Sequence, residues 1–241
     1  MLTRLTPRLV PKVWGSTHLT PLFPDSAEKI GEVWFERTPK PPLLIKFLFT
    51  TEPLSVQVHP EGKTEMWHIL AAEPGAKIAA GFREPITEER MRAAALSGEI
   101  EQLLEWYEAR PGDTFFIPAG TVHAIGAGLT LCEIQQWSDV TYRLFDYGRP
   151  RELHLDQGAR VSKLGPHPAR QSAREGTLVA CPFFTVEKRR VDGEWRCEAG
   201  SMIVVLDGVF KTGGQAASAG EIWYADSATQ ITGKATILLV H

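Results

Sequence analysis

Short apolar runs alternate with turn-forming residues along much of the chain. In the first two thirds, the runs with the length and apolar content of strands are Leu43–Phe49, Leu54–Val58, Trp67–Ala71, Phe115–Ile117 and Leu129–Ile134. Glycine and proline, which contribute 21 and 17 residues, fall between these runs. Short strands separated by glycine and proline are typical of sandwiches and barrels. The pattern therefore predicts a mainly β fold.

One segment, at about residues 87–108, departs from the strand pattern. Thr87 is a suitable N-cap, and residues that favour helices follow it as far as Leu104. Ser97 and Gly98 interrupt this run, because glycine destabilises the interior of a helix. We predict a helical insertion that consists of two short helices.

The apolar alternation stops at residues 165–175, where proline, alanine, arginine and serine replace it. This change of composition predicts a linker. Strand-like runs return beyond it, at Phe183–Val186, Met202–Leu206, Ile222–Tyr224 and Ile237–Val240. A chain of 241 residues has room for two units. We expect a larger unit at residues 1–164 and a smaller β unit at residues 176–241.

The charge of the chain is small, with 26 basic residues against 29 acidic ones and a net charge of −3. This balance disfavours nucleic acid and anionic membranes as partners. No apolar stretch reaches the ~18 residues of a membrane helix, and Met1–Val10 lacks the apolar core of a secretory signal. Three cysteines without a CxxC pair fit a reducing compartment. We expect a cytoplasmic protein and, since no exposed apolar stripe is evident, a monomer.

Two spaced motifs contain candidate metal ligands. On a strand, Gln57 and His59 point to the same face, and a turn at residues 60–62 would return Glu65 beside them. A later strand, closed by a Pro-x-Gly turn, is followed by His123. A single histidine is usually a core or surface residue, but the order of the two motifs favours one divalent ion per chain. The mixed donor set suits Zn²⁺, while Fe, Co and Mn remain alternatives.

The order of these motifs, Gln-x-His-x5-Glu and then Gly-x5-Pro-x-Gly-x2-His, resembles the paired metal motifs of the cupin superfamily. More specific strings occur in order between residues 11 and 146. They are Pro-Lys-Val-Trp-Gly at 11–15, Gly-Glu-Val-Trp at 31–34, Pro-Leu-Ser-Val-Gln-Val-His-Pro at 53–60, Gly-Lys-Thr-Glu-Met-Trp at 62–67 and Ser-Asp-Val-Thr-Tyr-Arg-Leu-Phe-Asp at 138–146. These strings resemble type I phosphomannose isomerase, especially its short bacterial form.

The resemblance implies a cupin fold, in which a double-stranded β-helix (jelly-roll) barrel carries the helical insertion. A second, smaller cupin-like β barrel is expected to follow the linker, without metal ligands, since His241 is the only histidine there. The implied reaction is the reversible interconversion of mannose 6-phosphate and fructose 6-phosphate through a cis-enediol. The implied partner is thus a small phosphorylated sugar, and the implied cofactor is Zn²⁺ held by Gln57, His59, Glu65 and His123.

The resemblance also matches Lys63 and Arg143 to basic active-site residues of the family. Lys63 shares the strand face of Glu65, and the planar fork of Arg143 suits a phosphate or an oxyanion. Lys46 lies in an apolar run, where an unpaired charge is costly, so it either pairs with an acid such as Glu32 or faces the pocket. We expect the side chain of Lys46 to face the pocket.

Residues expected to contact the substrate are Trp14, Lys46 and Ser55. Of the four tryptophans that either stack on a sugar or fill the core, namely Trp14, Trp34, Trp67 and Trp137, Trp14 is the expected contact. Asp139 and Asp146 flank Arg143 and are expected to orient it, and Glu133 is expected to act similarly.

Cupin folds support several chemistries, so other functions remain alternatives. One is an iron-dependent dioxygenase or a sugar epimerase, and another is a non-catalytic sugar-binding module. Metal identity distinguishes the dioxygenase from the isomerase, because a dioxygenase needs a redox metal and dioxygen. The sequence leaves the group that transfers the proton open.

Overall fold

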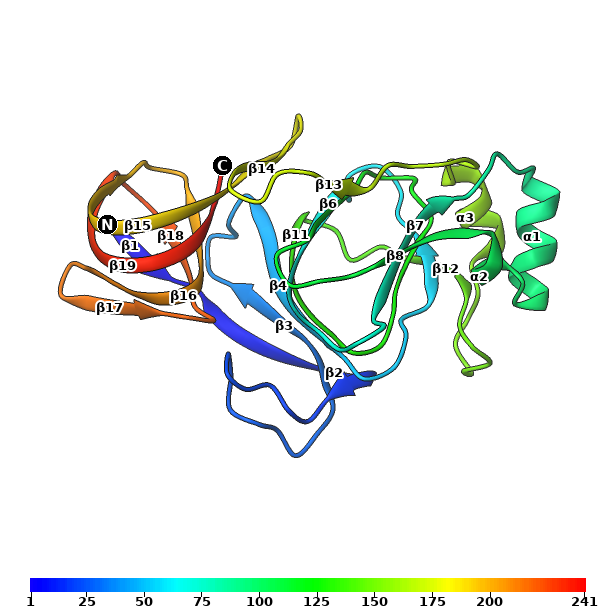
Figure 1. Ribbon diagram of the computed structural model, residues 1–241, viewed down its shortest axis with the longest axis horizontal. Helices are drawn as coiled ribbons and strands as arrows, with labels where there is room; N and C mark the ends of the chain where they lie inside the picture. Colours follow the sequence, from blue (N-terminus) through cyan, green and yellow to red (C-terminus); the bar gives the residue numbers. More distant parts are fainter.

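The computed structural model describes all 241 residues and shows two β-rich units side by side (Figure 1). The first unit contains two antiparallel sheets, and the second contains one curled sheet. Three helices lie at the end of the first unit that is farthest from the second (Figure 1). The predicted mainly β fold is confirmed.

The larger sheet of the first unit has seven strands. In spatial order they are β13 (Arg170–Gln171), β9 (Thr114–Ile117), β6 (Glu65–Ala72), β11 (Leu129–Gln136), β4 (Leu43–Thr50), β3 (Ile30–Glu36) and β2 (Thr6–Ser16). The smaller sheet consists of β12 (Tyr142–Phe145), β5 (Val56–Val58), β10 (His123–Ile125), β7 (Lys77–Phe82) and β8 (Leu104–Glu108).

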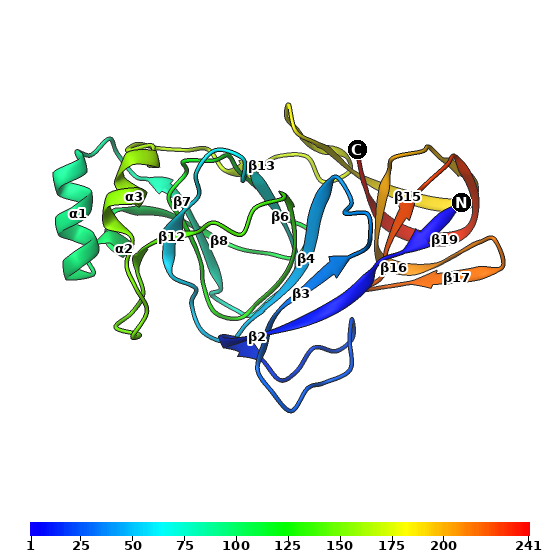
Figure 2. The ribbon, with the colours of Figure 1, turned by 180° about the vertical axis from the view of Figure 1, so that it is seen from behind.

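The sheet of the second unit also has seven strands. Its main path is β1 (Leu2–Arg4), β18 (Ile222–Ala225), β16 (Met202–Thr212), β19 (Thr229–Val240), β15 (Thr185–Cys197) and β14 (Gly176–Ala180), and β17 (Gln215–Ser218) pairs with β16. The chain therefore begins in the second unit. Figure 2 shows it passing from β1 into β2, at the edge of the larger sheet of the first unit.

Strand β4 shows how the alternation of side chains builds both sides of the larger sheet. Ile45 and Phe47 point to a core that the first unit shares with the second, where they join Val186 and Leu238. Lys46 points the other way, between the two sheets of the first unit. Every residue of β4 is buried, so its one charged side chain needs polar partners inside the barrel.

The helical insertion begins as predicted. The Oγ1 of Thr87 accepts a hydrogen bond from the Arg90 amide at 3.2 Å, and Gly98, at φ +84°, ends α1 (Glu88–Ser97). The short helix α2 (Ile100–Leu103) follows. The prediction is wrong for residues 104–108, which form β8, because the edge of β7 offers them a pairing partner that overrides their helix propensity.

Helix α3 (Leu155–Val161) was not predicted. It contains Gly158, which weakens a helical pattern in the sequence. In the structure, an added Cβ at this glycine would lie 2.5 Å from a methyl carbon of Leu144. The glycine therefore allows the helix to pack closely on the barrel.

The division of the chain at residues 165–175 stays a prediction, and two features qualify it. This segment is attached to the first unit, because β13 pairs with β9 and the carboxylate of Asp113 contacts Arg170 at 3.5 Å and Arg174 at 2.7 Å. In addition, β1 belongs to the second sheet. The two units are thus joined by a strand, by this segment and by a shared core.

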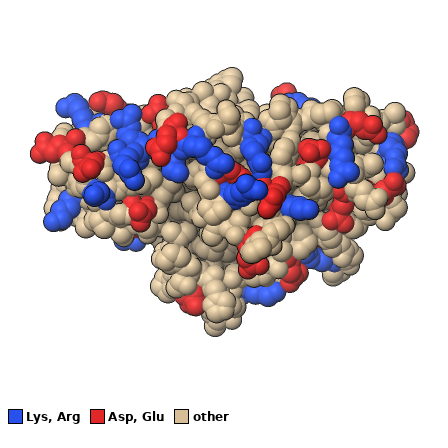
Figure 3. Space-filling model, in the orientation of Figure 1, with Lys and Arg blue, Asp and Glu red and all other residues tan.

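The face of the molecule in Figure 3 carries basic and acidic side chains side by side over both units. This intermixing agrees with the small net charge. None of the helices has both the length and the apolar character needed to span a membrane.

Candidate metal centre and pocket

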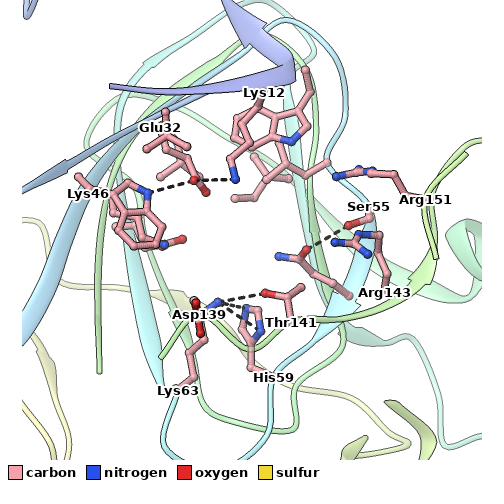
Figure 4. A pocket seen from close by; sticks show the side chains of 18 of the residues that line it. Lys12, Glu32, Lys46, Ser55, His59, Lys63, Asp139, Thr141, Arg143 and Arg151 are labelled. Atoms are coloured by element: carbon pink, nitrogen blue, oxygen red, sulfur yellow. Dashed lines mark hydrogen bonds and ion pairs between the residues drawn. The ribbon is translucent and has the colours of Figure 1, made fainter. Parts of the chain in front are cut away.

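A cavity of about 560 Å³ lies in the first unit between its two sheets. All the residues proposed from the sequence for catalysis and substrate binding line it, namely Trp14, Lys46, Ser55, Lys63 and Arg143. Figure 4 shows the last four of these around the cavity. Gln57 and His59 also line it, whereas Glu65 and His123 are only 1% and 0% exposed. The structure therefore brings the predicted site residues together.

Both sheets contribute to the candidate metal centre. His123, the first residue of β10, is the cross-strand partner of Gln57 on β5. His59 follows β5, and Gly62, at φ +86°, allows the turn that leads to Glu65 at the start of β6. The sheets face each other, so ligands from opposite walls meet.

The candidate ligand atoms of His59, Glu65 and His123 all lie within 4.8 Å of one another. The Nε2 of His59 is 3.4 Å from Glu65 Oε2, and the Nε2 of His123 is 3.7 Å from Glu65 Oε1. The side-chain nitrogen of Gln57 is 3.2 Å from His123 Nε2. His59, Glu65 and His123 thus form a possible metal-binding triad, and Gln57 lies beside it.

The hydrogen bonds of this triad leave a place for a cation. The Nδ1 of His59 is 3.0 Å from the carbonyl of Val140, and the Nδ1 of His123 is 2.8 Å from the carbonyl of Thr121. A carbonyl only accepts, so each Nδ1 carries the hydrogen and each Nε2 presents a lone pair. Both carboxylate oxygens of Glu65 are buried without a hydrogen bond. Buried acceptors that face one another are costly unless a cation lies between them, so the residues fit a metal.

The protonation states agree with this fit. Burial lowers the pKa of His59 to about 4 and lowers the pKa of His123, so both imidazoles are neutral at pH 7. Burial raises the pKa of Glu65, but the adjacent His59 and Lys63 outweigh it and hold this pKa below its usual value. Neutral imidazoles and a carboxylate are the forms that bind metal ions.

Lys63 lies against the triad. Its Nζ is 3.1 Å from His59 Nε2 and 3.9 Å from Glu65 Oε2, and it donates to the hydroxyl of Thr141 at 3.3 Å (Figure 4). Burial lowers the pKa of Lys63. The contact with Thr141 was not predicted, because no local pattern links residues so far apart in the chain.

Lys46 both lines the cavity and is paired. Its Nζ donates to Glu133 Oε1 at 2.9 Å and to Gln135 Oε1 at 2.7 Å. Burial lowers the pKa of Lys46, but Glu133 and Glu32 outweigh burial and raise it. The hydrogen-bonded acid is therefore Glu133 rather than Glu32. Sequence reasoning missed Gln135, although it lies two residues from Glu133 on the same strand face.

Glu32 has a different partner on the wall of the cavity. Its Oε2 lies 3.1 Å from Lys12 Nζ and accepts a hydrogen bond from Trp34 Nε1 at 3.0 Å. Burial raises the pKa of Glu32, but Lys46 and Lys12 outweigh it and lower this pKa. Lys12 and Glu32 occur in the sequence motifs at residues 11–15 and 31–34. The alternation of side chains along β2 and β3 could have assigned both to the pocket, but they were not predicted there.

The opposite side of the cavity carries the guanidinium groups of Arg143 and Arg151 (Figure 4). Arg143 donates to the carbonyl of Glu152 at 3.0 Å and makes no ion pair with a carboxylate. The expectation that Asp146 orients Arg143 is wrong, because Asp146 binds Arg151 at 2.5 and 2.6 Å and Arg149 at 3.2 Å. Arg149 and Arg151 therefore form the ion pairs with this buried carboxylate in place of Arg143. Asp139 lines the cavity.

Trp14 and Ser55 both lie at the cavity, with different contacts. Trp14 is 3% exposed and packs in the inner apolar cluster. The hydroxyl of Ser55 donates to Gln57 Oε1 at 3.1 Å, so it fixes the amide of a candidate ligand. Turning this amide over would present its oxygen toward His123 instead, with Ser55 then acting as the acceptor.

No family model matches the sequence. The mannose-6-phosphate isomerase of Streptococcus mutans is 38% identical over 177 residues, which are 63% of this chain and 55% of that protein. The putative mannose-6-phosphate isomerase YvyI of Bacillus subtilis is 30% identical over 253 aligned residues, covering 79% of each chain. The crystal structure of the mannose 6-phosphate isomerase from Bacillus subtilis matches with a TM-score of 0.83 at 25% identity, over 99% of this chain and 98% of that chain. The chain thus spans about half the length of the first of these relatives.

Proposed function

The chain belongs to the mannose-6-phosphate isomerase family, and from this premise we propose that it interconverts mannose 6-phosphate and fructose 6-phosphate as an aldose–ketose isomerase. One observation carries the proposal. A buried carboxylate without hydrogen bonds, Glu65, lies between the Nε2 atoms of two neutral histidines beside a cavity with several cationic side chains. Such a site suits a divalent ion and an anionic substrate.

The proposed ion is one Zn²⁺ per chain, with Gln57, His59, Glu65 and His123 as its ligands. Two imidazoles, one carboxylate and one amide oxygen are donors that zinc accepts. When bound, the ion would supply Lewis-acid stabilisation of negative charge on the oxygens at C1 and C2 of the sugar.

The reaction moves one proton between C1 and C2 and another between their oxygens, and the carbonyl shifts in the opposite direction. Lys63 is the proton-carrying side chain that contacts the triad. Because burial lowers its pKa, Lys63 gives up a proton more readily than an exposed lysine does, and it is also placed to donate to a sugar hydroxyl. The ammonium of Lys46, held by Glu133, is suited to a second oxygen of the sugar.

The phosphate is proposed to lie on the side of Arg143. This guanidinium has no carboxylate partner and lies across the cavity from Lys46 (Figure 4). A dianionic phosphate prefers such a planar, unneutralised fork of donors. Trp14 and Ser55 are proposed to contact the sugar between the two ends.

The experiment that tests the function is isomerisation of mannose 6-phosphate by the purified protein under nitrogen. We expect turnover that a chelator abolishes and added Zn²⁺ restores. Turnover under nitrogen also excludes a dioxygenase. No turnover of this sugar or of related aldose phosphates by zinc-loaded protein would overturn the proposal and favour a non-catalytic sugar-binding cupin.

We further propose that the protein acts as a monomer in the cytoplasm. The small net charge and three free cysteines support this proposal. Size-exclusion chromatography with light scattering tests the oligomeric state, and a mass near twice 26.7 kDa would contradict it.

A further inference from the structure

A row of cross-strand neighbours crosses the inner face of the larger sheet. Arg8 on β2 lies opposite Trp34 on β3, Trp34 lies opposite Lys46 on β4, and Lys46 lies opposite Glu133 on β11. Glu133 in turn lies opposite Trp67 on β6 and accepts a hydrogen bond from its Nε1 at 3.1 Å. Directly opposed side chains on one sheet face contact each other. The row therefore connects the rim of the pocket with its interior.

Trp34 is fully engaged in this row. The guanidinium carbon of Arg8 lies 4.7 Å from the centre of its ring, and the Nζ of Lys46 lies 4.6 Å from it, one cation from each neighbouring strand. Its Nε1 donates to Glu32 at 3.0 Å. Both the ring and the N–H thus have partners, so Trp34 is not free to act as a stacking platform for a sugar.

The position of Trp34 separates two ion pairs. On one side, Lys46 contacts Glu133, and on the other, Lys12 contacts Glu32. Both lysines have long, flexible stems, and Glu32 as well as Glu133 attracts the charge of Lys46. Trp34 contacts both Lys46 and Glu32, so loss of its indole would remove a contact from each.

We propose that Trp34 is a positioning residue that holds Lys46 on Glu133 and keeps Glu32 on Lys12. The indole face confines the ammonium from the side that Glu133 and Gln135 leave open, and its N–H keeps Glu32 turned away. The consequence for turnover rests on the proposed function, since it assumes that Lys46 meets the substrate.

The test compares Trp34→Leu, which removes the aromatic face, with Trp34→Phe, which keeps a face and loses only the N–H. Trp195→Leu is the matched control, because Trp195 of the second unit also carries an arginine, Arg189, 5.0 Å from its ring centre. Two readouts are used. One is acylation of Lys46 by acetic anhydride, followed by peptide mass spectrometry, and the other is the pair kcat and KM for mannose 6-phosphate.

We expect Trp34→Leu to acylate several-fold faster at Lys46 and to lose about tenfold in kcat/KM, with a rise in KM. A loss of folded protein would lower kcat without changing KM, so the rise in KM reports the displaced lysine. Trp34→Phe should keep Lys46 protected but recover the activity only in part, because Glu32 loses the N–H that turns it toward Lys12. Trp195→Leu should match the wild type. In a Lys46→Ala background, Trp34→Leu should raise KM no further, because the two act through the same contact.

Unchanged acylation of Lys46 in Trp34→Leu would overturn the proposal, as would equal damage in Trp34→Phe and Trp34→Leu. The acylation readout needs no turnover. If the wild-type protein lacks isomerase activity, the proposed function fails while the positioning of Lys46 is still decided by acylation.

Discussion

The inner face of the first unit and the core of the second unit are built from similar antiparallel strands but differ in what they bury. The first unit buries ionisable side chains, including Lys46, Lys63, Glu65, Glu133 and Asp146. Between residues 176 and 241, the buried polar side chains are only Ser201 and Thr212, and the core there consists of residues such as Phe210 and Ile237. Buried charges rarely stabilise a fold, even when they are paired. The first unit therefore buries charged side chains that serve its chemistry and add little to its stability, whereas the second unit buries none.

The largest expected effect comes from removing the charge at the centre of the first unit. Glu65→Gln should reduce the proposed isomerase activity below detection and abolish stoichiometric binding of the proposed zinc ion, because the proposed carboxylate ligand is lost. The metal-free variant should unfold at a lower temperature than the metal-free wild type, because the buried ammonium of Lys63 loses the carboxylate that lies 3.9 Å from it. Elemental analysis and thermal denaturation with chelator check both outcomes.

The matched control for this change is Glu108→Gln on the exposed edge strand β8, which should leave zinc content and activity unchanged. A metal-free Glu65→Gln protein that is as stable as the metal-free wild type would show that Lys63 does not depend on this carboxylate.

A second change makes the first unit resemble the second. Glu133→Ala leaves the Lys46 ammonium buried and unpaired, so we expect a loss of about 3–5 kcal/mol in the free energy of unfolding. Replacing both partners, as Lys46→Met with Glu133→Gln, should recover the stability, because no charge remains and Trp67 keeps an acceptor. Activity should stay low in both. Urea denaturation measures the free energies.

The exposed ion pair between Arg90 and Glu99 provides the control, and Glu99→Ala should change stability far less. The contrast between buried and exposed pairs fails if the double variant remains as unstable as Glu133→Ala.

A third prediction concerns His68, which lies on the outer face of β6, near the second unit. Burial lowers its pKa to about 4, below the ordinary value of 6.5, and the imidazole is hydrogen-bonded to Thr114 at 2.9 Å. The unfolded chain binds a proton more tightly than the native state, so this histidine lowers stability as the pH falls from 6.5 to 4. The expected loss is about 3 kcal/mol.

His68→Gln should therefore lose less stability than the wild type between pH 7 and pH 4, by roughly that amount. Urea denaturation at both pH values, with chelator present, makes the measurement. Parallel pH profiles for the two proteins would assign the acid sensitivity to other groups.

The smallest effect is expected at the helical end, away from the buried charges. Thr87→Ala removes the hydrogen bond to the Arg90 amide and should cost about 1 kcal/mol of stability. Activity should not change, and Thr87→Ser should behave as the wild type. A marked fall in kcat/KM in Thr87→Ala would mean that α1 influences the pocket.

Local patterns in the sequence predicted the features that depend on neighbouring residues. The two-residue spacing of Gln57 and His59 and the cap at Thr87 are of this kind. The missed features depend on pairing between distant segments. Lys46 and Glu133 are 87 residues apart, and β8 is a strand because β7 is its neighbour. No periodicity along the chain records such partners.

The pairing of β1 with β18 bears on the biosynthesis of the protein. Leu2 lies opposite Ala225, so β1 leaves the ribosome before its partner strand, which is made more than 200 residues later. At common rates of translation, that interval is on the order of ten seconds or more. During this time β1 has no partner strand, and the apolar outer face of the first unit has no cover. We therefore expect nascent chains to recruit chaperones until the second unit emerges, and the two units to join only after the strands of the second unit have been made.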